Sequence, residues 1–444
     1  MAEPTLEGLP VELHISILFT LPDLGSLWSL ILASPAYYDA YQLVKKELLQ
    51  SFLQKHYAGL VDIADAIAAI RSRGLYAYDI SNKEKIIALL DCRRRSDEIR
   101  QLGLSVGPLP DEPANVEETI QLLQLHNLAI LVLEDYSKTA KRPFWIEHNK
   151  WAHDFLPLVL SDTEKRRIFR AFYRLQIYGN IFGGVERSAD SGFSLQHNEW
   201  FNKDKTFTGE ESWRLFLATM APWEIEEFAC LFQHCCHRYR GMIREVSDSL
   251  IQTGCTFLGE LPEDLRVPRA TYINDCDDLR YAEDVPEHMS SIGPALLGKI
   301  LREKQFLARR NLVLVNARGF RYQFNDIGIW PFPDSPRDEV HLIYPADRFD
   351  FGTDIDGLRK LLNTLPSSER PSIVWERIWL RDDGEHPELF WDMFEYGSEN
   401  HYRPWGYALW EDERLIDWAT PLLADDYPIW DLNADNPYTI PSPE

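Results

Sequence analysis

The chain contains little cysteine and few basic residues for its length of 444 residues. Its six cysteines do not have the spacing of a secreted disulfide framework, so we expect reduced thiols in an intracellular protein. The 46 Lys and Arg stand against 70 Asp and Glu, which gives a formal net charge of −24. A surface of this charge repels phosphate backbones and anionic lipids. We therefore expect neither nucleic acid nor a membrane as a partner.

Long hydrophobic runs and targeting signals are also missing. No apolar run approaches the roughly 18 residues that a membrane-spanning helix requires. The first residues lack the basic stretch and the uninterrupted apolar segment of a secretory signal peptide. The expected location is therefore the cytoplasm, the nucleus or both.

Sequence motifs that carry catalysis are absent. The chain has no phosphate-binding Gly-rich loop, no Gly-x-Ser-x-Gly, no His-Glu-x-x-His and no Cys-x-x-Cys. We therefore predict no enzymatic activity, no catalytic residue and no cofactor. An unrecognised enzyme is the less favoured alternative, and it would have to use one of two sets of residues: His148, His153 and Asp154, or Cys230, His234 and His237.

The second of these sets has the residue types of a zinc site. Cys230, His234 and His237 share one face of a helix predicted at about 223–252. The same helix carries a continuous apolar stripe, and no second element supplies a further ligand, so we interpret its cysteines as core residues. An acidic run lacks the glycine and the final Glu of a calcium loop and is predicted to be solvated: Asp347, Asp350, Asp354 and Asp356. No metal site is predicted.

Apolar residues recur at helical spacing over most of the sequence, which predicts a mainly α fold with few short strands. Longer helices are expected at about 116–136, 161–178, 211–220, 223–252 and 288–307, and a β-like run at 312–315. Residues 5–50 are predicted to form a small module, and residues 51–444 a large, irregular helical domain with a linker near 106–114. Eight of the 14 Trp lie beyond residue 329, where they either anchor loops in the core or line a ligand groove.

Prolines and capping residues divide the N-terminal module into three helices. Pro10 suits a first helical turn, and Pro22 ends that helix. Asp23 can cap the second helix, and Ser34 followed by Pro35 starts the third. Each helix is too short to be stable alone, so the three must pack on one another or on a partner.

This module resembles an F-box. The family has a Leu-Pro-x-Glu opening, an Ile-Leu-x-x-Leu helix and two further Leu-rich helices; its third helix usually carries Cys or Ser and then Trp, where this chain has Tyr37 and Tyr41. Residues 405–418 also resemble a Trp-rich C-terminal segment of F-box-like proteins of filamentous fungi. The matching positions of the module are Leu9, Pro10, Glu12, Ile15, Leu18, Leu21, Leu24, Leu27 and Leu30.

The resemblance implies a substrate-recognition adaptor of an SCF-type cullin-RING ubiquitin ligase. The module would bind a Skp-type adaptor of the cullin complex, and the rest of the chain would hold a protein substrate that the sequence does not identify. An apolar stripe on short helices is costly unless a partner covers it. The alternative is a scaffold whose N-terminal helices merely pack on its own body. The residues predicted to form the adaptor-binding surface or its immediate support are Leu9, Pro10, Leu13, Ile17, Leu18, Leu21, Leu24 and Leu27.

Overall fold

The computed structural model describes residues 6–92, 107–187, 207, 212, 215–252, 254, 284–317, 355–380 and 402–423. The chain is mainly helical, as predicted, and within these ranges it contains no strand. The longer helices are α1 (Val11–Thr20), α2 (Leu24–Ala33), α3 (Pro35–Tyr57), α4 (Ile63–Arg71), α5 (Lys83–Asp91), α7 (Val116–Thr139), α9 (Asp162–Ile181), α11 (Pro222–Gln252), α13 (Asp284–Ser291), α14 (Pro294–Arg302), α15 (Phe306–Asn316), α17 (Ile355–Leu362), α18 (Ile373–Trp379) and α20 (Asp412–Asp417).

Several helices begin where the capping residues predict. The Asp23 carboxylate accepts a hydrogen bond from the Ser26 amide at the start of α2 (2.8 Å). Ser161 and Glu164 form a reciprocal capping box at the start of α9, with bonds of 3.2 and 3.0 Å. Pro35 occupies the first turn of α3, but the hydroxyl of the preceding Ser34 makes no capping bond.

Two predictions for the region after residue 284 are wrong. The β-like run at 312–315 lies inside α15, because a short apolar run that is buried on most sides has the same composition in a helix as in a strand. The single helix expected at 288–307 is divided into α13 and α14. Gly293 lies between them with φ +109°, a backbone conformation that interrupts a helix.

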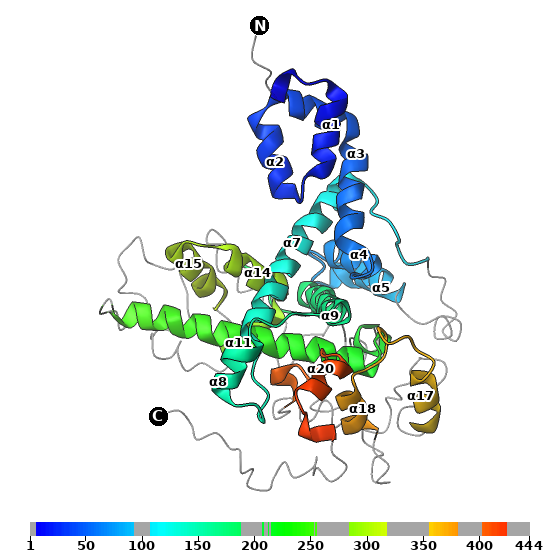
Figure 1. Cartoon of the computed structure of the whole chain (residues 1–444), viewed down its shortest axis with the longest axis vertical. Helices are drawn as coiled ribbons and strands as arrows, with labels where there is room; N and C mark the ends of the chain where they lie inside the picture. The colour runs from blue at the N-terminus through cyan, green and yellow to red at the C-terminus, as the bar shows by residue number, and fades with distance from the viewer. Residues whose placement is uncertain are drawn as a thin grey trace.

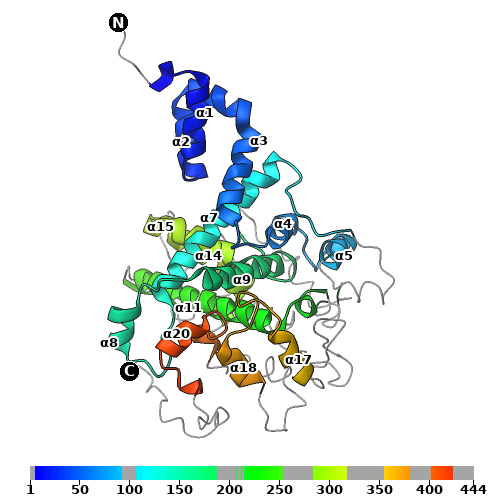
Figure 2. The ribbon, with the colours of Figure 1, turned by 45° about the vertical axis from the view of Figure 1, so that its right-hand side comes forward.

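Helices α1, α2 and α3 form a module that projects from the rest of the molecule (Figures 1 and 2). Both α1 and α2 pack on α3. The helix α3 continues past residue 50 to Tyr57, with a kink at Val44 (φ −123°), and its packing on α7 joins the module to the body. Residues 107–113, within the predicted linker, contain no helix.

The body is built around α9. This helix packs on α4 and α7 on one side and on α11 on the other, and most of its side chains are buried (Figure 1). The capping box accounts for the start of this helix, and buried apolar residues such as Ile168, Phe172 and Leu175 account for its place in the core. The helix α14 packs on α7, and α13 packs on α11.

The Trp-rich C-terminal segment closes the core. Trp405, Trp410 and Trp418 are buried, and the Trp410 ring contacts the Tyr136 ring of α7, with 5.6 Å between centroids. The Trp145 indole donates a hydrogen bond to the carbonyl oxygen of Trp418 (3.0 Å), across 273 residues of sequence. These rings therefore anchor the described part of the tail as core residues, the first of the two predicted roles.

No helix in the described ranges combines the length and the apolar character that a membrane crossing requires.

Candidate functional site

Large apolar side chains are exposed on all three helices of the N-terminal module. Leu13 of α1 is 48% exposed, Leu32 of α2 is 83% exposed and Leu43 of α3 is 68% exposed. Seven of the fourteen large apolar side chains that are exposed in the described residues lie between residues 6 and 43, which favours an interaction surface there. We call the exposed set the module surface: Leu6, Val11, Leu13, Phe19, Leu32, Tyr38 and Leu43.

The module is poor in charge from residue 13 to residue 33, whereas exposed Glu7, Glu12 and Asp39 adjoin Leu6, Val11 and Tyr38 in the sequence. Between residues 13 and 33, Asp23 and His14 are the only ionisable side chains in a protein with 26% charged residues. Asp23 is engaged in the cap of α2, and His14 is buried, with Nε2 donating to the Leu6 carbonyl oxygen (2.9 Å). Charged residues are depleted at the centres of protein interfaces, so this stretch has the composition of one.

The structure divides the eight predicted interface residues by exposure. Pro10 and Leu13 are exposed, whereas Leu9, Ile17 and Leu21 are half-buried. The remaining three are buried within the module and hold its helices together: Leu18, Leu24 and Leu27. Three of the eight residues therefore support the module from its interior, and five lie at or near its surface.

Two tyrosines of α3 fill the space under α1 and α2. The Tyr37 ring contacts the His14 ring, with 4.6 Å between centroids, and the Tyr41 ring meets the edge of Trp28 at 6.0 Å. Both tyrosines are about 2% exposed. These are the positions where the chain departs from the F-box pattern, and here they are core positions of the module.

Five members of the module surface in α1, α2 and α3 were not predicted from the sequence: Val11, Phe19, Leu32, Tyr38 and Leu43. The signal was present in α2, which contains no charged residue in its ten positions. A helix with one apolar face normally has charged residues on the other, so an uncharged second face indicates a second contact. A scaffold that covers its N-terminal helices with its own body would bury this face, but the main packing partner of both α1 and α2 is α3.

The first alternative catalytic set is exposed. His148, His153 and Asp154 lie on α8 (His148–Lys150) and the π-helical turn η3 (Trp151–Phe155), and all three side chains are exposed. Trp151 between them is buried and donates a hydrogen bond from its indole to the Ala140 carbonyl oxygen (3.0 Å). None of the three lines the pocket that the structure contains between α7, α9 and α14.

The second set does not form a metal centre among the described residues. Cys230 and His234 are buried on α11, whereas His237 is exposed. Burial raises the pKa of the Cys230 thiol well above its usual value, and burial lowers the pKa of His234 although the Asp135 carboxylate opposes the effect. A neutral imidazole at 4.3 Å from the Tyr136 ring and a neutral thiol are core groups, as we interpreted the cysteines of this helix.

The acidic run falls almost entirely outside the described residues. Asp347, Asp350 and Asp354 lie outside them, and Asp356 is an exposed residue in the first turn of α17. Its carboxylate lies 3.8 Å from the Arg359 guanidinium, one turn further along the helix.

Buried charges between α9 and α11 are a feature that the sequence analysis did not find. Arg170 pairs with Glu227 through two bonds of 2.7 and 2.8 Å, and Arg174 pairs with Glu224 at 2.7 Å. Burial acts to raise the pKa of Glu224, but Arg174 and Arg170 outweigh it and hold the pKa at about 2. Each of these arginines on α9 has a glutamate partner on α11, so the ion pairs join the two helices.

Comparison with known proteins identifies no relative: no family model, no curated protein and no solved structure matches the chain.

Proposed function

We propose that this chain is a substrate-recognition adaptor of an SCF-type cullin-RING ubiquitin ligase, and that its N-terminal module binds a Skp-type adaptor. The observation that carries the proposal is the set of exposed apolar side chains on α1, α2 and α3, together with the absence of charge from α2. A protein with a net charge of −24 has ample charge to cover such a surface, yet leaves it apolar. Burial against a partner is the physical reason to keep it so.

The construction of the module supports a role in docking. Leu18, Leu24 and Leu27 are fully or almost fully buried, so the helices are fixed relative to one another without a partner. The module also projects from the body, which leaves the body's own surface free for a substrate (Figure 2). A preformed surface binds with less loss of conformational entropy than a disordered one.

The test is binding of the purified chain to a Skp-type adaptor, measured by calorimetry. Leu13→Glu/Phe19→Glu places two carboxylates on the module surface, where burying them unpaired costs enough to weaken binding by at least roughly 100-fold. The matched control is Leu307→Glu/Ile416→Glu, which charges two apolar residues of similar exposure on the body and should leave the affinity unchanged.

Far-ultraviolet circular dichroism and thermal melting check that both double variants fold as the wild type does. A wild-type chain that does not bind the adaptor would overturn the proposal. Equal affinity of the wild type and Leu13→Glu/Phe19→Glu would show that the module surface is not the contact.

A further inference from the structure

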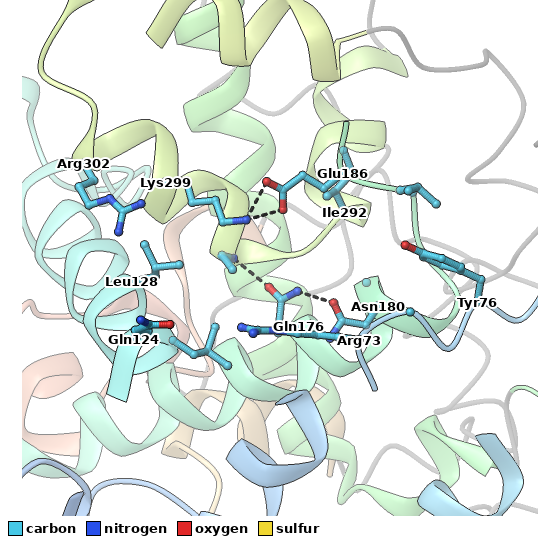
Figure 3. Close-up of a pocket in the computed structure, with 16 residues that line it drawn as sticks. Arg73, Tyr76, Gln124, Leu128, Gln176, Asn180, Glu186, Ile292, Lys299 and Arg302 are labelled. Atoms are coloured by element: carbon cyan, nitrogen blue, oxygen red, sulfur yellow. Dashed lines mark hydrogen bonds and ion pairs between the residues drawn. The ribbon is translucent and has the colours of Figure 1, made fainter. Parts of the chain in front are cut away.

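A pocket of about 560 Å³ lies between α7, α9 and α14 (Figure 3). Its other walls are the turn after α4, around residue 74, and the segment after α9, around residue 185. Pockets that bind small molecules usually have volumes of about 300–1,000 Å³. This pocket therefore has the size of a small-molecule site, and it is separate from the module surface.

Two amide side chains of α9 are held in place on the pocket wall. Gln176 accepts a hydrogen bond from the Ala295 amide (2.9 Å) and donates one to Asn180 (2.8 Å), as Figure 3 shows. Asn180 donates to the Ala69 carbonyl oxygen (2.8 Å) and to the Ser72 hydroxyl (2.9 Å). The wall is thus ordered before any ligand enters, which favours binding.

The charged residues of the pocket are three cations and one carboxylate. The Glu186 carboxylate is paired with Lys299, whose Nζ lies 2.6 and 2.7 Å from its two oxygens. Arg73 and Arg302 line the pocket from exposed positions, and in the described part of the chain neither forms an ion pair or a side-chain hydrogen bond. Burial lowers the pKa of the Arg73 guanidinium, and Glu186 partly opposes this effect. An arginine nevertheless keeps its charge at neutral pH, so the pocket has an excess of positive charge in a strongly acidic protein.

Apolar groups complete the lining. Leu125, Leu128 and Ile292 form an almost fully buried part of the wall, and the half-buried Tyr76 stands at the opposite side of the pocket from Leu128 (Figure 3). A ligand that fills this space therefore has an organic part as well as a charged one.

We infer that this pocket binds a small organic phosphate ester. Guanidinium groups present paired N–H donors that match the oxygens of a phosphate. A phosphate monoester carries between one and two negative charges at neutral pH, which corresponds to the two arginines that form no direct ion pair. A carboxylate has a single charge and would leave one of them uncompensated. The organic group of the ester would contact the leucines and Tyr76.

The test is calorimetry of the full chain with phenyl phosphate, which joins a phosphate to one ring. We expect binding, and we expect Arg73→Gln and Arg302→Gln each to weaken it by roughly tenfold or more. Glu186→Gln should strengthen it, because the substitution removes the negative charge that repels the ligand and frees Lys299. Arg244→Gln removes the same charge from an exposed position of α11 that does not line the pocket, and should leave the affinity unchanged.

A phosphoserine peptide and its unphosphorylated form distinguish a free ester from a modified protein. Binding of phenyl phosphate with no gain for the phosphopeptide over the unphosphorylated peptide supports the inference. Binding of the phosphopeptide alone would overturn the assignment to a small molecule. Failure of phenyl phosphate to bind at millimolar concentration, or equal affinity of Glu186→Gln, Arg73→Gln and the wild type, would overturn the anion site. None of these measurements depends on a Skp-type adaptor.

Discussion

At the scale of single residues, Arg403 and Glu226 form an ion pair inside the core. Neither side chain has exposed surface, and the guanidinium donates two hydrogen bonds to the carboxylate at 2.6 and 2.9 Å. The Tyr407 hydroxyl donates a third bond to the same carboxylate (2.8 Å). Burial opposes the charge of Arg403, but Glu226 outweighs it and holds the pKa above its ordinary value. The pair ties the C-terminal segment to α11 across 177 residues.

Replacing Arg403 tests this pair. Arg403→Met leaves Glu226 buried without its counter-ion, and we expect the free energy of unfolding in urea to fall by about 3–5 kcal/mol. Adding Glu226→Gln to Arg403→Met removes the orphaned charge and keeps an acceptor for Tyr407, so the double variant should recover part of that loss. Lys165→Met removes the solvent-exposed pair of Lys165 with Asp162 and should cost less than about 1 kcal/mol. Equal losses for Arg403→Met and Lys165→Met would contradict the prediction.

At the scale of helices, the ends were predicted better than the contacts. The capping box of Ser161 with Glu164 and the aspartate cap of α2 are interactions within four residues, so their signal lies in adjacent sequence. The contact between α9 and the turn that joins α13 to α14 could not be predicted in this way, because it joins segments that are far apart in the sequence. A Cβ atom on Gly179 would lie 2.7 Å from the Ile292 carbonyl oxygen, so only glycine allows the two segments to approach.

The same substitution at two helical glycines should have opposite effects. Alanine is favoured over glycine in a helix by about 1 kcal/mol, and Gly241→Ala in α11 meets no atom within 4 Å, so it should raise stability. Gly179→Ala brings the new methyl group against backbone and should lower stability by about 1–3 kcal/mol despite the better helix propensity. Thermal and urea unfolding of the two variants measure whether each substitution raises or lowers the free energy of unfolding. A gain in stability for Gly179→Ala would show that the turn after α13 yields to the methyl group.

At the scale of the whole molecule, the module and the body meet at a buried histidine. His126 of α7 hydrogen-bonds through Nδ1 to the Tyr173 hydroxyl of α9 (2.9 Å), and that hydroxyl is bonded to the Tyr57 hydroxyl of α3 (3.1 Å). Burial lowers the pKa of His126 to about 3, with a smaller contribution from His56. The imidazole is therefore neutral in the folded protein down to strongly acidic pH.

This junction should make the protein less stable in acid. Below pH 6.5 the unfolded chain takes up a proton at His126 that the folded chain does not accept until about pH 3. The free energy of unfolding therefore falls as the pH falls through this window. The loss is at most about 1.4 kcal/mol for each unit by which the pKa of His126 differs between the unfolded and the folded chain. His126→Gln should flatten the dependence of the urea midpoint on pH between 6.5 and 4. His148→Gln, at an exposed position, should retain the wild-type slope. An unchanged slope in His126→Gln would contradict the assignment.

The sequence by itself determined what neighbouring residues control. Proline and capping residues divide α1, α2 and α3 at the predicted places, and apolar spacing predicts the long helices α7 and α9. The tryptophans of the tail had two possible roles in the sequence, and the structure places the described ones in the core. Only the tertiary structure decided which leucines of the module support it and which face solvent. It alone brought Arg73, Lys299 and Arg302 to one pocket and Arg403 to Glu226. Helix ends depend on backbone groups within one turn. Arg73 is instead more than a hundred residues from Lys299 and Arg302, as Arg403 is from Glu226, and these charges meet only when the chain packs.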